Sequence, residues 1–389
     1  MYLVGKTGTG KSTLLHNLMA DDLENGRGFA LIDPHGDLSQ YIADITPKCR
    51  TNDVIYFDPL DQDFAVGFNP LARVPIEQRS IATAAIISAF KNIWSDSWGP
   101  RLEYIFGNTL RLLLDVPNAT LLHVPLVLAH EHYRKRLLKY CTDSFNLYYW
   151  TTEVPQVNER MWAEWISPVQ NKVGQFAANP NLRAIFGQSS STLDFDDIIN
   201  SRKVLIAKLS KQMGEGPSHL LGALLSTAFA QAAERRATIP ESDREDFTLY
   251  VDEFQNFATD TFASVLSEAR KWRLNLVLAN QFVEQLPESL KQGVLGNVGT
   301  LVVFRVGSQD AELLSKELGL PDLPGVSRQL TDTPNFQAWV KRVATDALSI
   351  KTLPVVTTGS RLDEVRRRTQ SRYMRSRRAV ERQTERIFN

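Results

Sequence analysis

The opening residues of the chain combine glycines, lysines and a serine at a spacing that suits phosphate binding. Gly5-Lys6-Thr7-Gly8-Thr9-Gly10-Lys11-Ser12 fits the pattern G-x-x-x-x-G-K-[ST]. Glycines let successive backbone N–H groups turn toward phosphate oxygens, and a helix that begins near Gly10 directs its positive end at the same anion. Lys11 would place its charge on the β- and γ-phosphates, and Ser12 would offer a hydroxyl to Mg²⁺. The pattern predicts a site for ATP and Mg²⁺.

The residues around this loop favour the same interpretation. Residues 2–4 are apolar and predict a short strand, and leucines at 14, 15 and 18 predict a helix after the loop. A chance glycine-rich turn would not require that context. We assign nucleotide binding to the following residues: Gly5, Thr7, Gly8, Thr9, Gly10, Lys11, Ser12 and Thr13.

An acidic pair follows an apolar run in the second half of the chain. Residues 247–251 predict a buried strand, and Asp252 and Glu253 stand at its carboxyl end, where open α/β sheets bind their ligands. Asp252 would hold Mg²⁺ through water, and Glu253 would polarise the water that attacks the γ-phosphate. A helix cap would also explain an acidic pair here, but the phosphate loop in the same chain favours the catalytic interpretation.

Three further side chains could sense the terminal phosphate or stabilise its charge. Gln281 ends another predicted strand, where its amide could contact the γ-phosphate or the attacking water; a polar strand end is the alternative. Arg270 falls on the rim of the apolar stripe of a predicted helix after residue 260, from which it could reach a neighbouring subunit's phosphate. Arg305 ends a third predicted strand and is the second candidate, although a buried ion pair would explain it equally.

The segment LIDPHGDL carries three more polar residues of interest. Asp33 closes a predicted strand beside the phosphate loop and is expected to face the same pocket. Asp37 precedes a predicted helix and has Gln40 three residues later, a capping-box spacing, so we interpret it as a helix cap. We interpret His35 as a turn residue rather than a ligand.

The composition limits the classes of protein that remain. The chain has 389 residues, enough for two domains, and carries 44 basic and 44 acidic residues. Residues 361–389 hold ten arginines and four acidic residues, so the positive charge is concentrated at this end of the sequence. A polyanion would therefore have to be bound locally rather than by a uniformly basic surface. Cys49 and Cys141 are too few for a disulfide framework and lack metal-ligand spacing. There is no run of 18 apolar residues, so no membrane span is predicted.

The order of predicted elements gives the organisation of the chain. Strands alternate with helices up to residue 57 and again from Val204 onward, which predicts an α/β fold with a mainly parallel sheet. Between these parts the periodicity is helical. We therefore predict a first core part at 1–74, an all-α insertion at 75–191, a second core part at 192–350 and a basic C-terminal tail at 351–389.

Taken together, these motifs resemble the HerA/FtsK superfamily of ring-shaped motor ATPases, and most of all its type IV coupling and TraG/TraD-type conjugative transfer ATPases. The similarity extends over residues 1 to about 350 and is carried by GKTGTGKSTLL, LIDPHGDL, GFNPL, WGPRLE, NKVGQF, LYVDEFQNFATD, LSEARKWRLNLVLANQF and NVGTLVVFRVGSQDAELL. The resemblance implies a RecA-like P-loop NTPase core with an all-α inserted domain, and a homo-hexamer with ATP at the subunit interfaces.

The resemblance also implies roles for single residues. Lys11 and Ser12 correspond to the Walker A pair, and Asp252 and Glu253 to the Walker B pair. Arg270 falls at the spacing of an arginine finger that acts on the neighbouring subunit. Gln281 falls at the spacing of a glutamine sensor.

The family usually has a substantial region before the P-loop, whereas only four residues precede Gly5 here. We expect a cytoplasmic location. Attachment to the cytoplasmic face of the membrane, through a partner or through a missing N-terminal region, is an alternative that stays open. A membrane protein, a nuclease or a secretion component would fit as partner.

The leading hypothesis is an ATPase that moves DNA, single- or double-stranded, through a ring, in conjugative transfer or HerA-like processing. Two basic stretches could contact DNA: residues 130–140, where we favour ordinary solvated charge, and the C-terminal tail, where the two interpretations are balanced. A secretion ATPase that moves protein cargo is the first alternative. A nucleotide-gated assembly module is the second, although it would have no need of Glu253 as a base.

Overall fold

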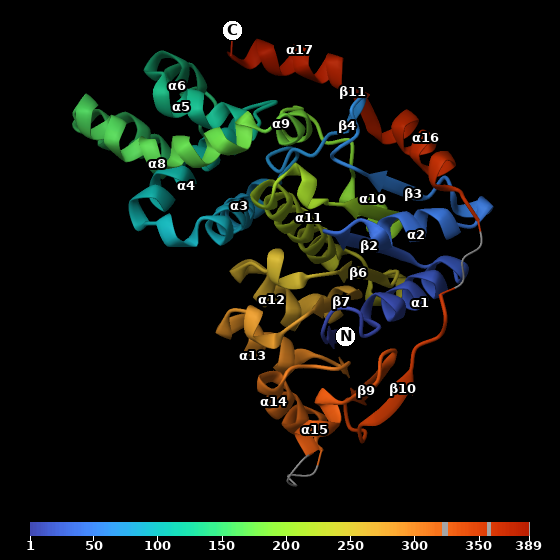
Figure 1. Ribbon diagram of the computed structural model, residues 1–389. Coiled ribbons are helices and arrows are strands. Elements are labelled where there is room, and N and C mark those ends of the chain that lie inside the picture. The colour runs from blue at the N-terminus through green and yellow to red at the C-terminus, as the bar shows by residue number, and fades with distance from the viewer. Residues whose placement is uncertain (321–325, 356–358, 389) are drawn as a thin grey trace. The chain divides into compact units, whose positions relative to one another are not determined.

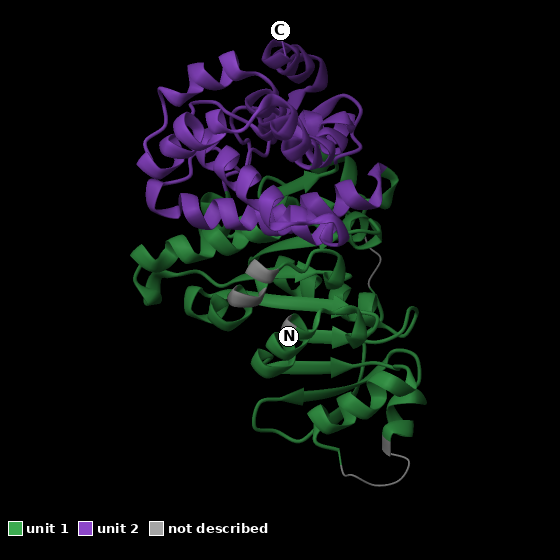
Figure 2. Ribbon diagram, turned by 90° about the vertical axis from the view of Figure 1, so that its left-hand side faces the viewer, with its two compact units in different colours: residues 1–58, 195–212, 225–369 green, residues 59–194, 213–224, 370–389 purple. Residues whose placement is uncertain are grey.

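The computed structural model describes residues 1–320, 326–355 and 359–388, which fall into two compact units. Unit 1 comprises residues 1–58, 195–212 and 225–369, and unit 2 comprises residues 59–194, 213–224 and 370–389 (Figure 2). The chain therefore passes between the units several times, and each unit is assembled from segments that are distant in the sequence.

Unit 1 is built on one sheet. Within the described residues its strands lie in the order β10-β9-β8-β1-β7-β6-β2-β5-β3 (Figure 1). In chain order they are β1 (Tyr2–Val4), β2 (Gly28–Asp33), β3 (Val54–Phe57), β5 (Val204–Lys208), β6 (Phe247–Val251), β7 (Leu274–Asn280), β8 (Thr300–Val303), β9 (Gln337–Arg342) and β10 (Leu348–Lys351). Neighbours from β8 to β3 pair in parallel, and β9 and β10 pair antiparallel. The predicted mainly parallel sheet is confirmed.

Helices cover both faces of this sheet. They are α1 (Lys11–Glu24), α2 (Asp37–Ile45), α10 (Phe195–Asn200), α12 (Asp260–Glu268), α13 (Glu288–Asn297), α14 (Ser308–Leu318), α15 (Val326–Thr331) and most of α11 (Glu215–Arg235) and α16 (Leu362–Tyr373). Side chains of α1, α2 and α16 share one core cluster with Phe29 and Leu31 of β2. On the opposite face Phe229 of α11 stacks on Phe247 of β6. Burial on both sides explains why the central strands are almost wholly apolar.

Unit 2 is mainly helical. Its elements are β4 (Phe64–Val66), α3 (Arg79–Ile93), α4 (Pro100–Asp115), α5 (Val124–Ala129), α6 (Glu131–Leu138), α7 (Ser144–Tyr148), α8 (Glu159–Ala178), α9 (Pro180–Phe186), β11 (Met374–Ser376) and α17 (Arg377–Phe388). The predicted helical insertion at 75–191 differs from this unit, which begins at Pro59, ends its first segment at Asp194 and includes a two-stranded sheet. A three-residue strand such as β4 is too short to give an alternating pattern, and its partner β11 lies about 310 residues away.

Residues 362–388 of the C-terminal segment form α16, β11 and α17, and some of their arginines take part in packing. Arg366 lies over the ring of Tyr56 in unit 1, with 5.2 Å between the guanidinium carbon and the ring centre. In unit 2 the buried Arg377 donates to the carbonyl oxygen of Pro59 and to the side chain of Asn181. These arginines are used in packing, because their guanidinium groups match carbonyl and aromatic partners along the chain.

The basic stretch at residues 130–140 is also partly structural. Arg134 of α6 is buried, lies over the rings of Trp150 and Trp162, and donates to the carbonyl oxygen of Val127 at 2.8 Å. Burial lowers the pKa of its guanidinium. Among the described residues, no helix combines the length and apolar character that a membrane span would require.

Arg134 allows a test of this packing. Arg134→Ala removes two ring contacts and leaves a buried carbonyl without its donor, so we expect the free energy of unfolding to fall by about 3 kcal/mol in urea denaturation. The matched control is Lys135→Ala on the same helix, since Lys135 is exposed and pairs at the surface with Glu131. That change should cost at most about 0.5 kcal/mol. Equal effects of the two variants would contradict the assignment.

Candidate functional site

The phosphate loop follows β1 at the carboxyl edge of the sheet. Gly8 and Gly10 have positive φ angles of 75° and 121°, a region that side chains rarely adopt, which explains the glycines at these positions. Gly10 is also the N-cap of α1 and has no side-chain partner there. The N-terminus of α1 therefore opens toward the loop, as an anion site requires.

The side chains of Lys11 and Thr9 stabilise the loop through hydrogen bonds to its own carbonyl oxygens. The Lys11 ammonium donates to the carbonyl oxygens of Gly5 and Lys6, and the Thr9 hydroxyl donates to the carbonyl oxygen of Lys6 at 2.7 Å. Burial lowers the pKa of Lys11, whereas the nearby carboxylates of Glu253 and Asp252 act in the opposite direction. A buried cation therefore faces two acids from another part of the sequence.

One pocket of about 500 Å³ in unit 1 brings most of the predicted site together. Its lining includes the predicted residues Thr7, Gly8, Gly10, Lys11, Ser12, Thr13, Asp252, Glu253 and Gln281. Asp252 and Glu253 follow β6, and Gln281 follows β7. Because β6 and β7 are parallel neighbours, all three residues lie at the carboxyl edge of the sheet. Gly5 and Thr9 act on this pocket through the hydrogen bonds described above.

Glu253 is the most closely surrounded acid in the pocket. Its Oε2 accepts from Gln255 at 2.6 Å, and its Oε1 accepts from Gln281 at 2.8 Å and lies 3.9 Å from Nε2 of His35. Burial alone would raise the pKa of Glu253, but the nearby His35 ring and the hydrogen bonds from Gln255 and Gln281 outweigh it and lower the pKa to about 2. Its backbone is left-handed, with φ 50°, a strained state typical of functional sites.

Asp252 has the opposite electrostatic environment. It is 6% exposed, and burial raises its pKa to about 7, with the charges of Glu253 and Asp33 adding to that effect. Two adjacent carboxylates with pKa values moved apart are suited to different tasks. Glu253 is ionised and held by donors, whereas burial and the neighbouring charges favour the neutral form of Asp252.

Asp33 has a structural role that the sequence did not indicate. Its carboxylate accepts from the backbone N–H groups of His35, Gly36 and Ser39 and from the Ser39 hydroxyl, at 2.8–2.9 Å. The predicted cap at Asp37 is wrong: Gly36 is the N-cap of α2, without a side-chain cap bond, and Asp33 satisfies this helix end instead. The carboxylate binds N–H groups two to six residues later in the chain, which is an Asx-turn pattern rather than the capping-box spacing.

His35 is a pocket residue that sequence reasoning assigned only to a turn. It follows β2, the neighbour of β6, and lines the pocket beside Glu253. Its position directly after a predicted strand, where open α/β sheets bind ligands, was the signal that could have revealed it. His16 and Phe336 also line the pocket and were not predicted.

The two arginine candidates lie outside this pocket. Arg270 is exposed and lines a separate pocket of unit 1 together with Met1 and Leu274. The expectation that it lies on an α-helix is wrong, since α12 ends at Glu268 and a 3₁₀ turn follows over Ala269–Trp272. Arg305 donates to the side chain of Asn335 at 2.7 Å.

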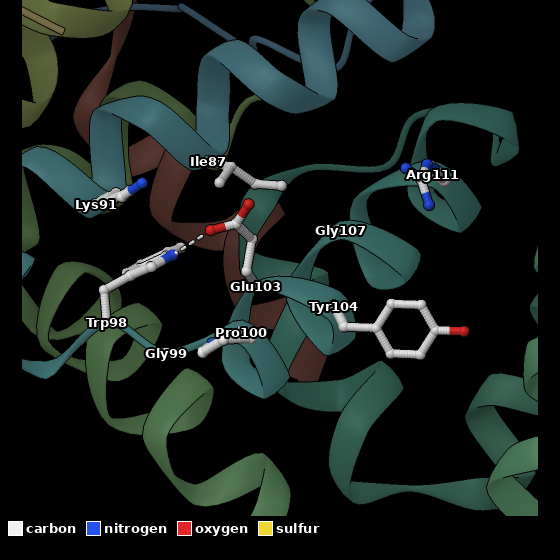
Figure 3. A pocket seen from close by; sticks show the side chains of 9 residues that line it. All are labelled: Ile87, Lys91, Trp98, Gly99, Pro100, Glu103, Tyr104, Gly107 and Arg111. Atoms are coloured by element: carbon white, nitrogen blue, oxygen red, sulfur yellow. Dashed lines mark hydrogen bonds between the residues drawn. The ribbon is translucent and has the colours of Figure 1, made fainter. Parts of the chain in front are cut away.

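A further pocket of about 510 Å³ lies within unit 2, between α3 and α4. Figure 3 shows Trp98 donating to Glu103, at 2.8 Å, with Lys91 and Arg111 among the other side chains that line it. It contains residues of the WGPRLE segment but none of the predicted site residues.

Comparison with known proteins decides the family. The sequence matches, over residues 1–336, the family described as type IV secretion-system coupling protein DNA-binding domain. The chain belongs to this family. The resemblance inferred from the motifs is thereby confirmed, and with it the context of type IV secretion and conjugation. A comparison with curated protein sequences found no match.

Solved structures share the fold of this coupling-protein family member. The bacterial conjugative coupling protein TrwBdeltaN70 in its unbound form is 15% identical, with a TM-score of 0.66 over 92% of this chain and 85% of that one. The plasmid coupling protein TrwB in complex with ADP and Mg²⁺ is 15% identical, with a TM-score of 0.65 over 92% and 86%. VirB4 of Thermoanaerobacter pseudethanolicus is 14% identical, with a TM-score of 0.61 over 91% and 88%. At these identities the likeness concerns the fold, and it confirms the predicted P-loop NTPase class.

The contact between His35 and Glu253 predicts a linked titration. The Glu253 carboxylate, 3.9 Å from Nε2 of His35, raises the pKa of the imidazole above its ordinary value, because it stabilises the imidazolium. Glu253→Gln should therefore lower the His35 pKa, as measured by an NMR titration of ¹³Cε1-labelled histidines. The His35 signal can be assigned by its loss in His35→Gln. Glu284→Gln changes an exposed acid outside the pocket and should leave the titration in place. A His35 pKa that is the same with Glu or Gln at position 253 would contradict the contact.

Proposed function

We propose that this protein is an ATP-driven motor that hydrolyses ATP at the subunit interfaces of a homo-hexameric ring and moves DNA. The observation that carries the proposal is the convergence of Lys11, Glu253 and Gln281 on one pocket, from a P-loop and two neighbouring strand ends. A pocket that only held a nucleotide would not need an ionised carboxylate fixed by several donors. Membership of the coupling-protein family supports DNA as cargo.

The phosphate loop, Glu253 and Gln281 each have a chemical role in this proposal. Lys11 and the loop N–H groups bind the phosphates, and Glu253 accepts a proton from the attacking water. Gln281 already donates to Glu253, so it can report on the occupancy of the γ-phosphate position through the same amide.

The residues present fit a bound Mg²⁺. Ser12 and Asp252 line the same pocket, and a hydroxyl with one carboxylate is the small oxygen donor set that Mg²⁺ uses beside substrate phosphates. When bound there, Mg²⁺ would neutralise phosphate charge. The raised pKa of Asp252 fits this role, because a cation beside it would restore its ionised form. The related TrwB was solved in complex with ADP and Mg²⁺.

The position of Arg270 supports action between subunits. Its side chain is exposed and lines a different pocket from Lys11, so it does not serve the phosphate site of its own chain. An arginine that reaches a neighbour's phosphate must be exposed in the single chain. Arg305 is the weaker candidate because Asn335 already binds its guanidinium.

DNA-dependent turnover is the central test of the function. We expect double- or single-stranded DNA to stimulate ATP hydrolysis severalfold, and the stimulation to fall steeply with salt because phosphate contacts release counterions. Glu253→Gln should bind ATP but hydrolyse it about 10²–10⁴-fold more slowly, since it lacks the base. Rates would be measured on material of known oligomeric state. Hydrolysis without response to either form of DNA would favour the protein-cargo alternative, and absence of hydrolysis would favour the nucleotide-gated module.

Subunit mixing tests the placement of Arg270. Lys11→Ala and Arg270→Ala should each be nearly inactive, and mixing them should restore part of the ATPase rate, because some interfaces would join an intact P-loop to an intact arginine. The control mixes Lys11→Ala with Lys271→Ala, the exposed neighbour, whose activity should simply be diluted. No recovery at any ratio, in rings shown to exchange subunits, would argue against the interface role.

A further inference from the structure

The pocket also contains an aromatic side chain to which the proposed mechanism gives no role. Phe336 immediately precedes β9 and lines the pocket together with Gly10 and Lys11. Its side chain is 47% exposed, although phenylalanine is usually buried. A flat apolar surface therefore stands open at one end of a charged pocket.

The backbone around Phe336 is fixed to the P-loop. Its N–H donates to the carbonyl oxygen of Thr9 at 2.7 Å, and its carbonyl oxygen accepts from Thr352 at 2.9 Å. A Cβ atom on Gly10 would lie 3.0 Å from the Cα of Phe336, so the two segments approach as closely as a glycine allows. The φ angle of Phe336 is 64°, a strained conformation for an aromatic residue. The ring is thus held at a defined position relative to the phosphate loop.

The strand order places this ring opposite the catalytic acid. On one side of β1 lie β7, β6 and β2, which deliver Gln281, Glu253 and His35. On the other side lie β8 and β9, which deliver Phe336. A nucleoside triphosphate whose γ-phosphate is near Glu253 and whose phosphate chain lies along the P-loop must extend its base toward the β9 side.

We propose that Phe336 stacks on the nucleobase of the bound nucleotide and supplies base affinity through the face of the ring. The inference rests on the proposed function, since it requires this pocket to bind a nucleoside triphosphate. Stacking engages the π-face that every base has, and it reads no hydrogen-bonding edge. Phe336 accordingly contributes equally to the binding of ATP and GTP and nothing to the binding of the phosphate chain.

Calorimetric titration of three probes in the presence of Mg²⁺ tests this contribution: ATP, GTP and inorganic tripolyphosphate. The variant is Phe336→Asn, because asparagine tolerates the left-handed conformation and so removes the ring without adding backbone strain. We expect the Kd for ATP and for GTP to rise about tenfold and the Kd for tripolyphosphate to stay the same. Phe336→Trp should keep the affinity for both nucleotides.

Phe388→Ala is the matched control, because Phe388 is similarly exposed, at 50%, and lies outside the pocket. It should leave all three affinities unchanged. Thermal unfolding of each variant shows whether the fold is retained, and Phe336→Trp provides the test if Phe336→Asn does not fold.

Each other result overturns the inference in a recognisable way. Unchanged nucleotide affinity in Phe336→Asn would show that the ring does not touch the base, and equal weakening of all three probes would show that it only supports the P-loop. Weakening of ATP but not GTP would contradict face stacking. Wild-type protein that binds none of the probes would instead overturn the proposed function itself.

Discussion

One buried ammonium and two buried carboxylates share a small volume in unit 1, and the structure of the site depends on how they are accommodated. Lys11, Asp252 and Glu253 are each less than 10% exposed, so every one of their charges is costly unless it is compensated. The P-loop carbonyls compensate Lys11. Gln255 and Gln281 donate to Glu253, and the His35 ring lies beside it. Asp252 is left with the raised pKa.

This distribution of donors follows from the order of the strands. Because β2, β6 and β7 are parallel neighbours, the loops that follow them open at the same edge as the P-loop after β1. Two helices, α1 and α2, also begin at that edge. Asp33 occupies the N-terminus of α2 with its own carboxylate, whereas the N-terminus of α1 has no side-chain cap. At the phosphate pocket, the N-terminus of α1 is therefore free to receive an anion.

Several arginines outside the site are used in packing. Arg134 lies over two tryptophan rings, Arg366 over a tyrosine, and Arg377 donates to buried oxygens. Guanidinium groups used in this way stabilise the units and are not free for phosphate contacts. In the proposed motor, other basic residues would then contact the DNA, which fits a chain without net charge.

The sequence by itself determined the P-loop, the acidic pair and the alternating strands, because these depend on local spacing and on periodicity over a few residues. Only the tertiary structure decided which distant groups meet: His35 and Gln281 at Glu253, and Phe336 against Gly10. It also decided that the basic tail folds back as helices and a strand, and that the helix expected to carry Arg270 ends before it. These contacts depend on which strands become neighbours, and a local pattern carries no record of that choice.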